Sequence, residues 1–216
     1  PRALTSLKYF AEEAPEYAIC CAGSLLGVAL HEGTSFPVGK VEFLDLYPLS
    51  FREFLLANGE EMLVNYVLND GHRDLTVFAD KLTDYLKRYF VIGGMPSAVL
   101  KWLETHDYLE VDDVQKQLVA AYVNDFSKHA PRQMVEKIRY VWDCIPSQLA
   151  KENKKFIYGL VLEGARAREY EYSLMWLTDA GEIIRTYNVS KPDVPLKAYA
   201  DLKSFKVFLL DVGLLR

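Results

Sequence analysis

A stretch of the chain from Ser50 to about Ala130 carries its apolar side chains at the spacing of α-helices. Within residues 72–90 and 109–127, apolar positions recur every three or four residues and form one stripe along each predicted helix. Such stripes are buried economically when helices pack on helices. The pattern therefore predicts a helical bundle in the middle of the chain. Its stripe residues are Leu75, Phe78, Ala79, Leu82, Leu86 and Tyr89, and then Val111, Val114, Leu118, Tyr122 and Phe126.

The segment before this bundle has the pattern of a parallel α/β sheet. Residues 4–14 have helical spacing, and the short run Tyr17–Ala22 is continuously apolar, as in a strand that is covered on both faces. A second helix is expected at Leu25–Leu30 and a second strand at Val41–Leu46. The fold class predicted for the N-terminal part is therefore a remnant of a parallel α/β core.

Ser24 lies where the first predicted strand ends and the next helix begins. In open parallel sheets, ligands bind at the edge formed by these strand ends. A serine in this position also serves as the N-cap of the helix that follows. The sequence leaves both roles open.

The chain after Pro131 predicts a winged-helix domain. Helices are expected at residues 132–144, 146–153 and 165–180, with a short apolar piece at residues 156–162 between them. Two strands, Ile183–Val189 and Phe205–Leu210, follow, and the link between them contains Pro192 and Pro195, as a wing would. The whole chain is thus predicted to be mixed but mainly α, with domains at residues 1–57, 58–130 and 131–216.

Charge divides the chain in a similar place. Residues 1–127 carry 10 Lys and Arg against 19 Asp and Glu, whereas residues 128–216 carry 15 against 11. Only the second part is therefore a candidate for contact with nucleic acid. No apolar run is long enough to span a membrane. Three cysteines, two of them adjacent at Cys20 and Cys21, predict buried thiols in a reducing, cytoplasmic compartment.

Several motifs that suggest chemistry fail on spacing. The segment Gly33–Lys40 is rich in glycine and ends in lysine, but its glycines are too far apart for a Walker A loop and Val41 replaces the metal-binding Ser or Thr. The four histidines lack partners at metal-ligand spacing. Ser24 lacks the flanking glycines of a nucleophile elbow. The sequence therefore predicts neither a catalytic residue nor a metal site in this chain.

Several runs of residues resemble a poorly characterised group of bacterial and archaeal P-loop ATPases of the AAA superfamily, which carry a C-terminal domain of unknown function. The similarity covers nearly the whole chain. The runs are Leu7–Pro15, Ala22–Gly27, Ser35–Val41, Tyr47–Leu55, Gly93–Pro96, Arg166–Tyr170, Phe205–Lys206 and Leu210–Leu215.

In that group, the Walker A loop and the Walker B strand precede the segment that resembles residues 2–12. The resemblance therefore implies that this chain corresponds to the part after Walker B. It also implies that ATP and Mg²⁺ are cofactors of the intact parent ATPase. We expect no tightly bound cofactor and no ATP hydrolysis from this chain alone.

The resemblance also implies nucleotide-facing residues. Ser24 corresponds to a sensor position that responds to the γ-phosphate. Gly93, Gly94 and Pro96 correspond to a lid motif on the adenine side of the nucleotide. Their alternative role is a helix break, because glycine permits close backbone approach and proline suits the first turn of a helix. Three arginines are candidates for stabilising charge on the phosphates, and the sequence does not choose among them: Arg52, Arg88 and Arg132.

The predicted helix at residues 165–180 carries Arg166 and Arg168 near its start, where a DNA-reading helix would enter a major groove. Glu163, Glu169 and Glu171 lie beside these arginines and would repel phosphate. Two functions remain open at this point: the C-terminal part of an ATPase that acts through a protein partner or self-association, and a winged-helix module that binds nucleic acid or protein. The sequence favours contact with protein over direct reading of DNA.

Overall fold

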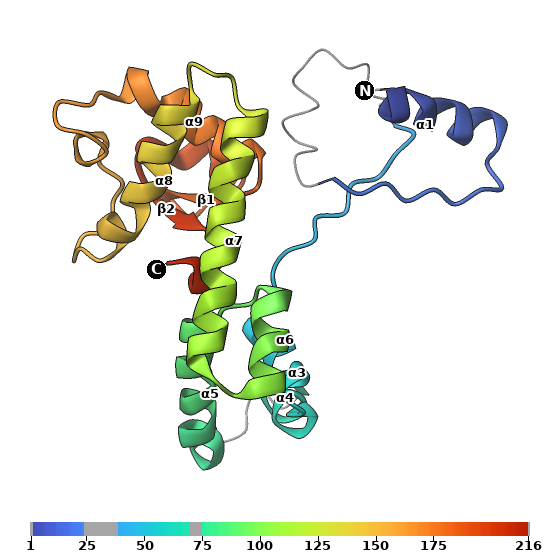
Figure 1. Ribbon diagram of the computed structural model, residues 1–216, viewed down its shortest axis with the longest axis vertical. Coiled ribbons are helices and arrows are strands. Elements are labelled where there is room, and N and C mark those ends of the chain that lie inside the picture. Colours follow the sequence, from blue (N-terminus) through green and yellow to red (C-terminus); the bar gives the residue numbers. More distant parts are fainter. Residues whose placement is uncertain (1, 24–38, 70–74, 216) are drawn as a thin grey trace.

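The computed structural model describes residues 2–23, 39–69 and 75–215 (Figure 1). These residues form a mainly helical structure with one small sheet. Within these ranges, no helix is both long enough and apolar enough to pass through a membrane. The elements are α1 (Arg2–Glu13), α3 (Phe51–Ala57), α4 (Glu61–Asn69), η1 (Leu75–Phe78), α5 (Ala79–Ile92), α6 (Pro96–Thr105), α7 (Tyr108–His129), α8 (Val135–Leu149), η2 (Tyr158–Leu160), α9 (Ala167–Asp179), β1 (Ile183–Val189), η3 (Leu196–Tyr199), β2 (Ala200–Leu209) and η4 (Val212–Leu214).

Helices α3 to α7 confirm the predicted helical run. Helix α3 begins at a capping box, in which the Ser50 hydroxyl accepts a hydrogen bond from the backbone N–H of Glu53 and the Glu53 carboxylate accepts one from the backbone N–H of Ser50. The helices enclose a small core that excludes water from the faces predicted to be apolar. Its buried residues are Phe54, Ile92, Ala98, Val99, Trp102 and Val111.

Residues 131–215, which we call the C-terminal module, surround a second and larger core. Helices α8 and α9 cover one face of the antiparallel hairpin of β1 and β2. The backbone N–H of Phe156 donates to the carbonyl oxygen of Phe205 (2.9 Å), so a short extended piece also lies along the outer edge of β2. The core includes Ile138, Val141, Trp142, Leu174, Leu177, Phe205 and Val207.

Helix α7 belongs to both cores. Val111, near its start, is buried among α3, α5 and α6, whereas Phe126, near its end, is buried against Trp142 and Trp176 of the module. Figure 1 shows α7 running from the helices at one end of the molecule to the module at the other. A single helix of 22 residues therefore connects the two parts without an intervening loop.

Two predicted boundaries in the module were wrong. The chain forms one helix, α8, where the sequence predicted two, because Pro146 lies in the last turn and removes only one backbone donor there. The second strand begins at Ala200 instead of Phe205, because Ala200 and Asp201 pair with Val189 and Asn188. The register then shifts, so residues 202–204 bulge out of β2 before pairing resumes at Phe205.

The N-terminal segment departs most from its prediction. Helix α1 is present, but residues 17–22 and 41–46 are extended chain with no strand pairing, and their side chains are mostly exposed. A parallel strand needs neighbours for its N–H and C=O groups, and neither stretch has one in the described part of the chain. Cys20 and Cys21 are consequently exposed instead of buried, while Cys144 is buried as expected. Ser24, the predicted helix Leu25–Leu30 and most of Gly33–Lys40 lie outside the described residues.

Candidate functional site at the joint between the helices and the module

The chain reverses direction between α5 and α6 at the pair Gly93–Gly94. Helix α5 ends at the buried Ile92, and Gly93 adopts a φ of 76°, a left-handed value that favours glycine. Pro96 then occupies the first turn of α6, where its missing N–H costs no helical hydrogen bond. The motif that suggested an adenine contact is thus a tight turn between two helices.

The carboxylate of Asp211 binds this turn. Its Oδ2 accepts a hydrogen bond from the backbone N–H of Gly94 (2.6 Å), and its Oδ1 accepts one from the backbone N–H of Gly213 (2.9 Å). Asp211 is buried, and only Leu210 separates it from the end of β2. One side chain therefore ties the end of the C-terminal module to the turn between α5 and α6.

Two further backbone segments converge on the same turn. The N–H of Leu49 donates to the carbonyl oxygen of Gly94 (2.7 Å), and the Tyr89 hydroxyl donates to the carbonyl oxygen of Leu49 (2.7 Å). The amide of Gln115, buried on α7, donates to the carbonyl oxygens of Val91 and Ile92, both at 2.9 Å. We call the set Leu49, Gly93, Gly94, Gln115, Asp211 and Gly213 the joint.

The joint has no room for side chains at its glycines. A Cβ atom on Gly93 would overlap Oδ1 of Asp211, and one on Gly94 would overlap the carbonyl oxygen of Leu49. A Cβ atom on Gly213 would lie 2.6 Å from the carbonyl oxygen of Ile92. Backbone groups can approach this closely only when the residues lack Cβ, so the three glycines are a steric requirement of the joint.

Buried acidic groups surround the joint on the module side. Burial raises the pKa of Asp211, although hydrogen bonds from Gly94, Gly213 and Val212 lower it in part. Burial, reinforced by the nearby charge of Asp125, raises the pKa of Glu182 from 4.5 to about 8.

Tyr122 of α7 faces the same acids. Burial and the charges of Glu182, Asp211 and Asp125 raise the pKa of its hydroxyl to about 12. At neutral pH this contact between α7 and the module therefore holds a neutral tyrosine and a mostly protonated Glu182.

Gly93 and Gly94 lie at the joint, both buried, while Pro96 beside them is exposed. Their adenine contact stays a prediction, as does the sensor role of Ser24, which lies outside the described residues.

The candidate arginines lie on separate elements. Arg52 is exposed on α3, Arg88 on α5 lies over the ring of Tyr85 (5.2 Å), and Arg132 is exposed before α8. The backbone N–H of Arg166 donates to the Glu169 carboxylate at the start of α9 (2.9 Å), and Arg168 is exposed in the first turn. The structure assigns no phosphate or nucleic-acid contact to these residues, so their roles stay predictions.

A cavity of about 510 Å³ lies beside α1 in the N-terminal segment. Its walls are α1 and the two stretches that were predicted as strands, including Ile19, Val41 and Phe43. Apolar side chains from both stretches line this cavity. Within the described ranges, no group of three or more His, Cys, Asp or Glu residues is arranged to hold a metal ion.

Sequence reasoning missed the residues that make the joint, apart from its two adjacent glycines. The run Leu210–Leu215 carries part of the family resemblance, but it predicted no role for Asp211 or Gly213. An available signal was the spacing Asp-x-Gly after a predicted strand, because an aspartate readily accepts a hydrogen bond from the N–H two residues later. Gln115 gave a weaker signal, as a polar residue close to the apolar stripe of a helix.

The fold and the joint define a mainly helical protein in which a helical part and a small α+β module share one long helix. The chain belongs to the family described as "Domain of unknown function (DUF8612)", whose family model matches residues 83–216. Residues 1–55 match the family model described as "AAA domain", so the N-terminal end is related to AAA-type ATPases. No curated protein and no solved structure matches the chain.

Proposed function

We propose that this chain is the coupling part of an AAA-type ATPase, in which a helical lid passes movement to a winged-helix module through the joint. The observation that carries the proposal is the buried carboxylate of Asp211, which binds Gly94 between α5 and α6 and Gly213 after β2. Movement of the helices around Gly94 cannot leave the module behind without breaking these buried hydrogen bonds.

The AAA relationship is supported at the N-terminal end. Residues 1–55 match an AAA domain, and residues 17–22 and 41–46 expose apolar side chains as unpaired, extended chain. Such stretches suit a sheet that is completed by further strands.

The winged-helix assignment is supported by the order of elements in the module. Helix α8, an extended piece at Phe156, η2, α9, β1, a long connection and β2 follow one another in the order of a winged-helix domain. The extended piece, which has one backbone hydrogen bond to Phe205, takes the place of the first strand. The long connection contains η3. Helix α9 then corresponds to the helix that reads DNA in winged-helix proteins.

A protein partner suits α9 better than DNA does. Tyr172 and Met175 are exposed on this helix, and Glu169 and Asp179 accompany them. Exposed apolar side chains beside carboxylates are typical of a protein contact, whereas a phosphate backbone requires an excess of cations. Arg166 and Arg168 remain the candidate contacts if nucleic acid binds.

The nucleotide side of the proposal rests on resemblance. ATP and Mg²⁺ are proposed as cofactors of the complete ATPase, with Ser24 near the γ-phosphate and Gly93, Gly94 and Pro96 near the adenine. Pro96 is the exposed face of that turn, so it is the part that an adenine ring could contact. No Walker A pattern occurs in the 216 residues, and we therefore propose that this chain alone does not hydrolyse ATP. A cytoplasmic location completes the proposal.

The nucleotide proposal is tested by incubating the chain with Mg²⁺ and ATP. We expect phosphate release no faster than in a blank without protein. Nuclear magnetic resonance with adenine nucleotide should shift the amide signals of Gly93 and Gly94, while the matched signal of Gly159, in the module, stays unchanged. Phosphate release that scales with protein concentration would contradict the claim of inactivity, and unchanged signals of Gly93 and Gly94 would contradict the adenine contact.

The coupling proposal is tested with the three tryptophans. Trp102 lies in the core of the helices, and Trp142 and Trp176 lie in the core of the module. Variants that keep either Trp102 alone or the other two alone report the unfolding of each part by fluorescence. With Asp211 intact, the two denaturant transitions should coincide, because the joint makes the parts unfold together.

In Asp211→Ala the two transitions should separate, because Gly94 and Gly213 lose their acceptor. Asp143→Ala, which removes an exposed carboxylate from α8, is the matched control and should leave the transitions coincident. Coincident transitions in Asp211→Ala would contradict coupling through the joint.

A further inference from the structure

The end of the β1–β2 hairpin exposes most of its side chains in the described chain, although Phe205 is buried in the core of the module. We define this hairpin end as residues 189–206. Val194 is 86% exposed and Leu202 is 70% exposed, and Leu196 is exposed close by in sequence. Four lysines and two aspartates accompany these aliphatic residues. An apolar surface with a cationic border is typical of an interaction site for an anionic partner.

The hairpin end is held in a fixed conformation. The backbone N–H of Ser190 donates to the carbonyl oxygen of Tyr199 (3.0 Å), and the ammonium group of Lys191 lies over the Tyr199 ring and 2.7 Å from an Asp193 oxygen. The N–H of Lys203 donates to Asp201 (2.9 Å) within the bulge of β2. A surface that is ordered before binding loses less conformational entropy when a partner docks.

The turn between α6 and α7 has the opposite character. We call residues 100–113 the α6–α7 corner. It carries one lysine against five carboxylates, and it exposes Leu100, Tyr108 and Leu109, the last at 75%. Its apolar side chains and its charge therefore complement those of the hairpin end.

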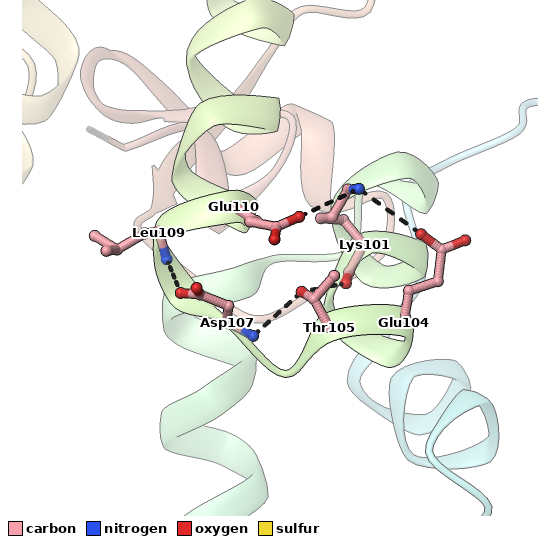
Figure 2. A network of polar contacts seen from close by, with 6 residues as sticks. All are labelled: Lys101, Glu104, Thr105, Asp107, Leu109 and Glu110. Atoms are coloured by element: carbon pink, nitrogen blue, oxygen red, sulfur yellow. Dashed lines mark hydrogen bonds and ion pairs between the residues drawn. The ribbon is translucent and has the colours of Figure 1, made fainter.

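The corner is also held in a fixed conformation (Figure 2). Lys101 pairs with Glu104 (3.8 Å) and Glu110 (3.4 Å), and the N–H of Leu109 donates to Asp107 (2.8 Å). Figure 2 shows the side chain of Leu109 directed away from this network. Lys116, just beyond the corner, pairs with Asp112 (2.6 Å) and Asp113 (3.6 Å). The five carboxylates still outnumber these two lysines, so the corner keeps an acidic surface around an exposed leucine.

The two surfaces cannot meet within one molecule. The corner lies at the first turn of α7, while the module packs against Phe126, which is 17 residues or about 25 Å further along the helix. The hairpin end lies at the far end of β1 and β2 from the joint, about 20 Å away along the strands. A second copy of the chain can bring its hairpin end to the corner of the first.

We propose that the chain associates head to tail, with the hairpin end of one copy docked on the α6–α7 corner of the next. Lys197 and Lys203 face the carboxylates of Glu104 and Glu110, and Leu202 packs with Leu109. The contact uses two different surfaces, so a copy that has docked through one of them still has the other one free. Such a contact produces a ring if the rotation closes and an open chain if it does not.

The test is a charge exchange measured by sedimentation velocity at low ionic strength. The wild-type chain should form larger species as its concentration rises, and salt should weaken them. Lys197→Glu with Lys203→Glu should weaken association at least about tenfold, and so should Glu104→Lys with Glu110→Lys. Lys151→Glu with Lys154→Glu, in the exposed segment after α8, is the matched control and should associate as the wild type does.

The decisive step is to combine the reversed surfaces. A mixture of the two double variants should associate again, because each reversed surface finds a reversed partner, and the quadruple variant should associate by itself. Leu109→Ser and Leu202→Ser, both at exposed positions, test the apolar contact without altering charge. A wild-type chain that stays monomeric at every concentration, or a mixture that fails to associate, would overturn the proposal. Capture of duplex DNA or anionic lipid vesicles by a monomeric chain would overturn it as well.

Discussion

The N-terminal segment and the C-terminal module contain similar apolar stretches but differ in what those stretches become. Ile183–Val189 is a strand of the module, whereas residues 17–22 and 41–46 remain unpaired. Leu174 is fully buried in the module, whereas Leu44 and Leu46 are 93% and 95% exposed. The difference lies in the partners, because β1 has β2 beside it and α8 and α9 above it.

The local preference of a segment for extended backbone and its pairing with a neighbouring strand are separate requirements. A run of apolar residues favours an extended backbone, but its N–H and C=O groups are satisfied only when a neighbouring strand is present. The module supplies its own neighbour through a hairpin. The N-terminal stretches have no such neighbour in the described part of the chain.

The same substitution in the two regions should give the largest contrast. Leu174→Ala should lower the free energy of unfolding by about 2–5 kcal/mol, because it removes buried methyl groups and leaves a cavity. Leu44→Ala should change it by less than about 0.5 kcal/mol, since its side chain is already in solvent. Urea denaturation followed by circular dichroism measures both, and equal losses would show that residues 41–46 are packed in solution.

The joint should respond to a single added methyl group. Gly94→Ala should lower the free energy of unfolding by about 1–3 kcal/mol, because its Cβ would overlap the carbonyl oxygen of Leu49. Gly159→Ala is the control, since a Cβ there would lie in open space. Thermal unfolding compares the two, and a Gly94→Ala chain as stable as Gly159→Ala would mean that the joint is looser than described.

Glu182 makes the module sensitive to pH, a property that distinguishes it from the exposed N-terminal segment. Between pH 4.5 and about 8, Glu182 is protonated in the folded chain and ionised in the unfolded chain. The contribution of this protonation to the free energy of unfolding is therefore complete below pH 4.5 and declines as the pH rises. Glu182→Gln should therefore be more stable than the wild type near neutral pH, by about 1–3 kcal/mol. Denaturation across this pH range measures the effect.

Glu152→Gln, which alters an exposed carboxylate after α8, is the control for Glu182→Gln. If both variants lose stability with pH as the wild type does, Glu182 is not the group responsible.

Ion pairs in the two regions should give the smallest contrast. Glu171 binds Arg185 (2.9 Å) and the hydroxyl of Tyr158 inside the module, and Arg185 is 9% exposed. Glu171→Gln should cost about 1 kcal/mol, because hydrogen bonds to a charged acceptor become neutral ones. Glu12→Gln, which alters a half-exposed pair with Lys40 at 3.8 Å, should have no measurable effect. Chemical denaturation near neutral pH compares them, and a larger loss in Glu12→Gln would reverse the comparison.

The parts of the fold that could be predicted from sequence are those governed by local periodicity. The stripe from Val111 to Phe126 predicted α7, and the run Ile183–Val189 predicted β1 with its observed bounds. The predicted break before Pro146 was wrong, because a proline in the last turn of a helix removes only one backbone hydrogen-bond donor. The sequence pattern did not predict the early start of β2, since Ala200 and Asp201 have low strand preference. They pair because Asn188 and Val189 lie opposite them.

The joint could be predicted only in part. Gly93 and Gly94 indicated a break between two helices. No periodicity connects Gly94 with Asp211, which is 117 residues away. The contact depends on the path of the whole chain, including the length of α7 and the exit of β2. A buried carboxylate that binds backbone amides is a long-range feature, and a single sequence carries no signal for such pairing.

Helix α7 has 22 residues and is therefore about 33 Å long. Because Val111 and Phe126 lie in different cores, a small rotation of α7 at one end produces a larger displacement at the other end. A rotation of ten degrees at the α6–α7 corner would sweep the distal end through roughly 6 Å, which is more than one helical turn. A displacement of that size is measurable by fluorescence energy transfer between a dye at the end of α7 and a second dye on α5.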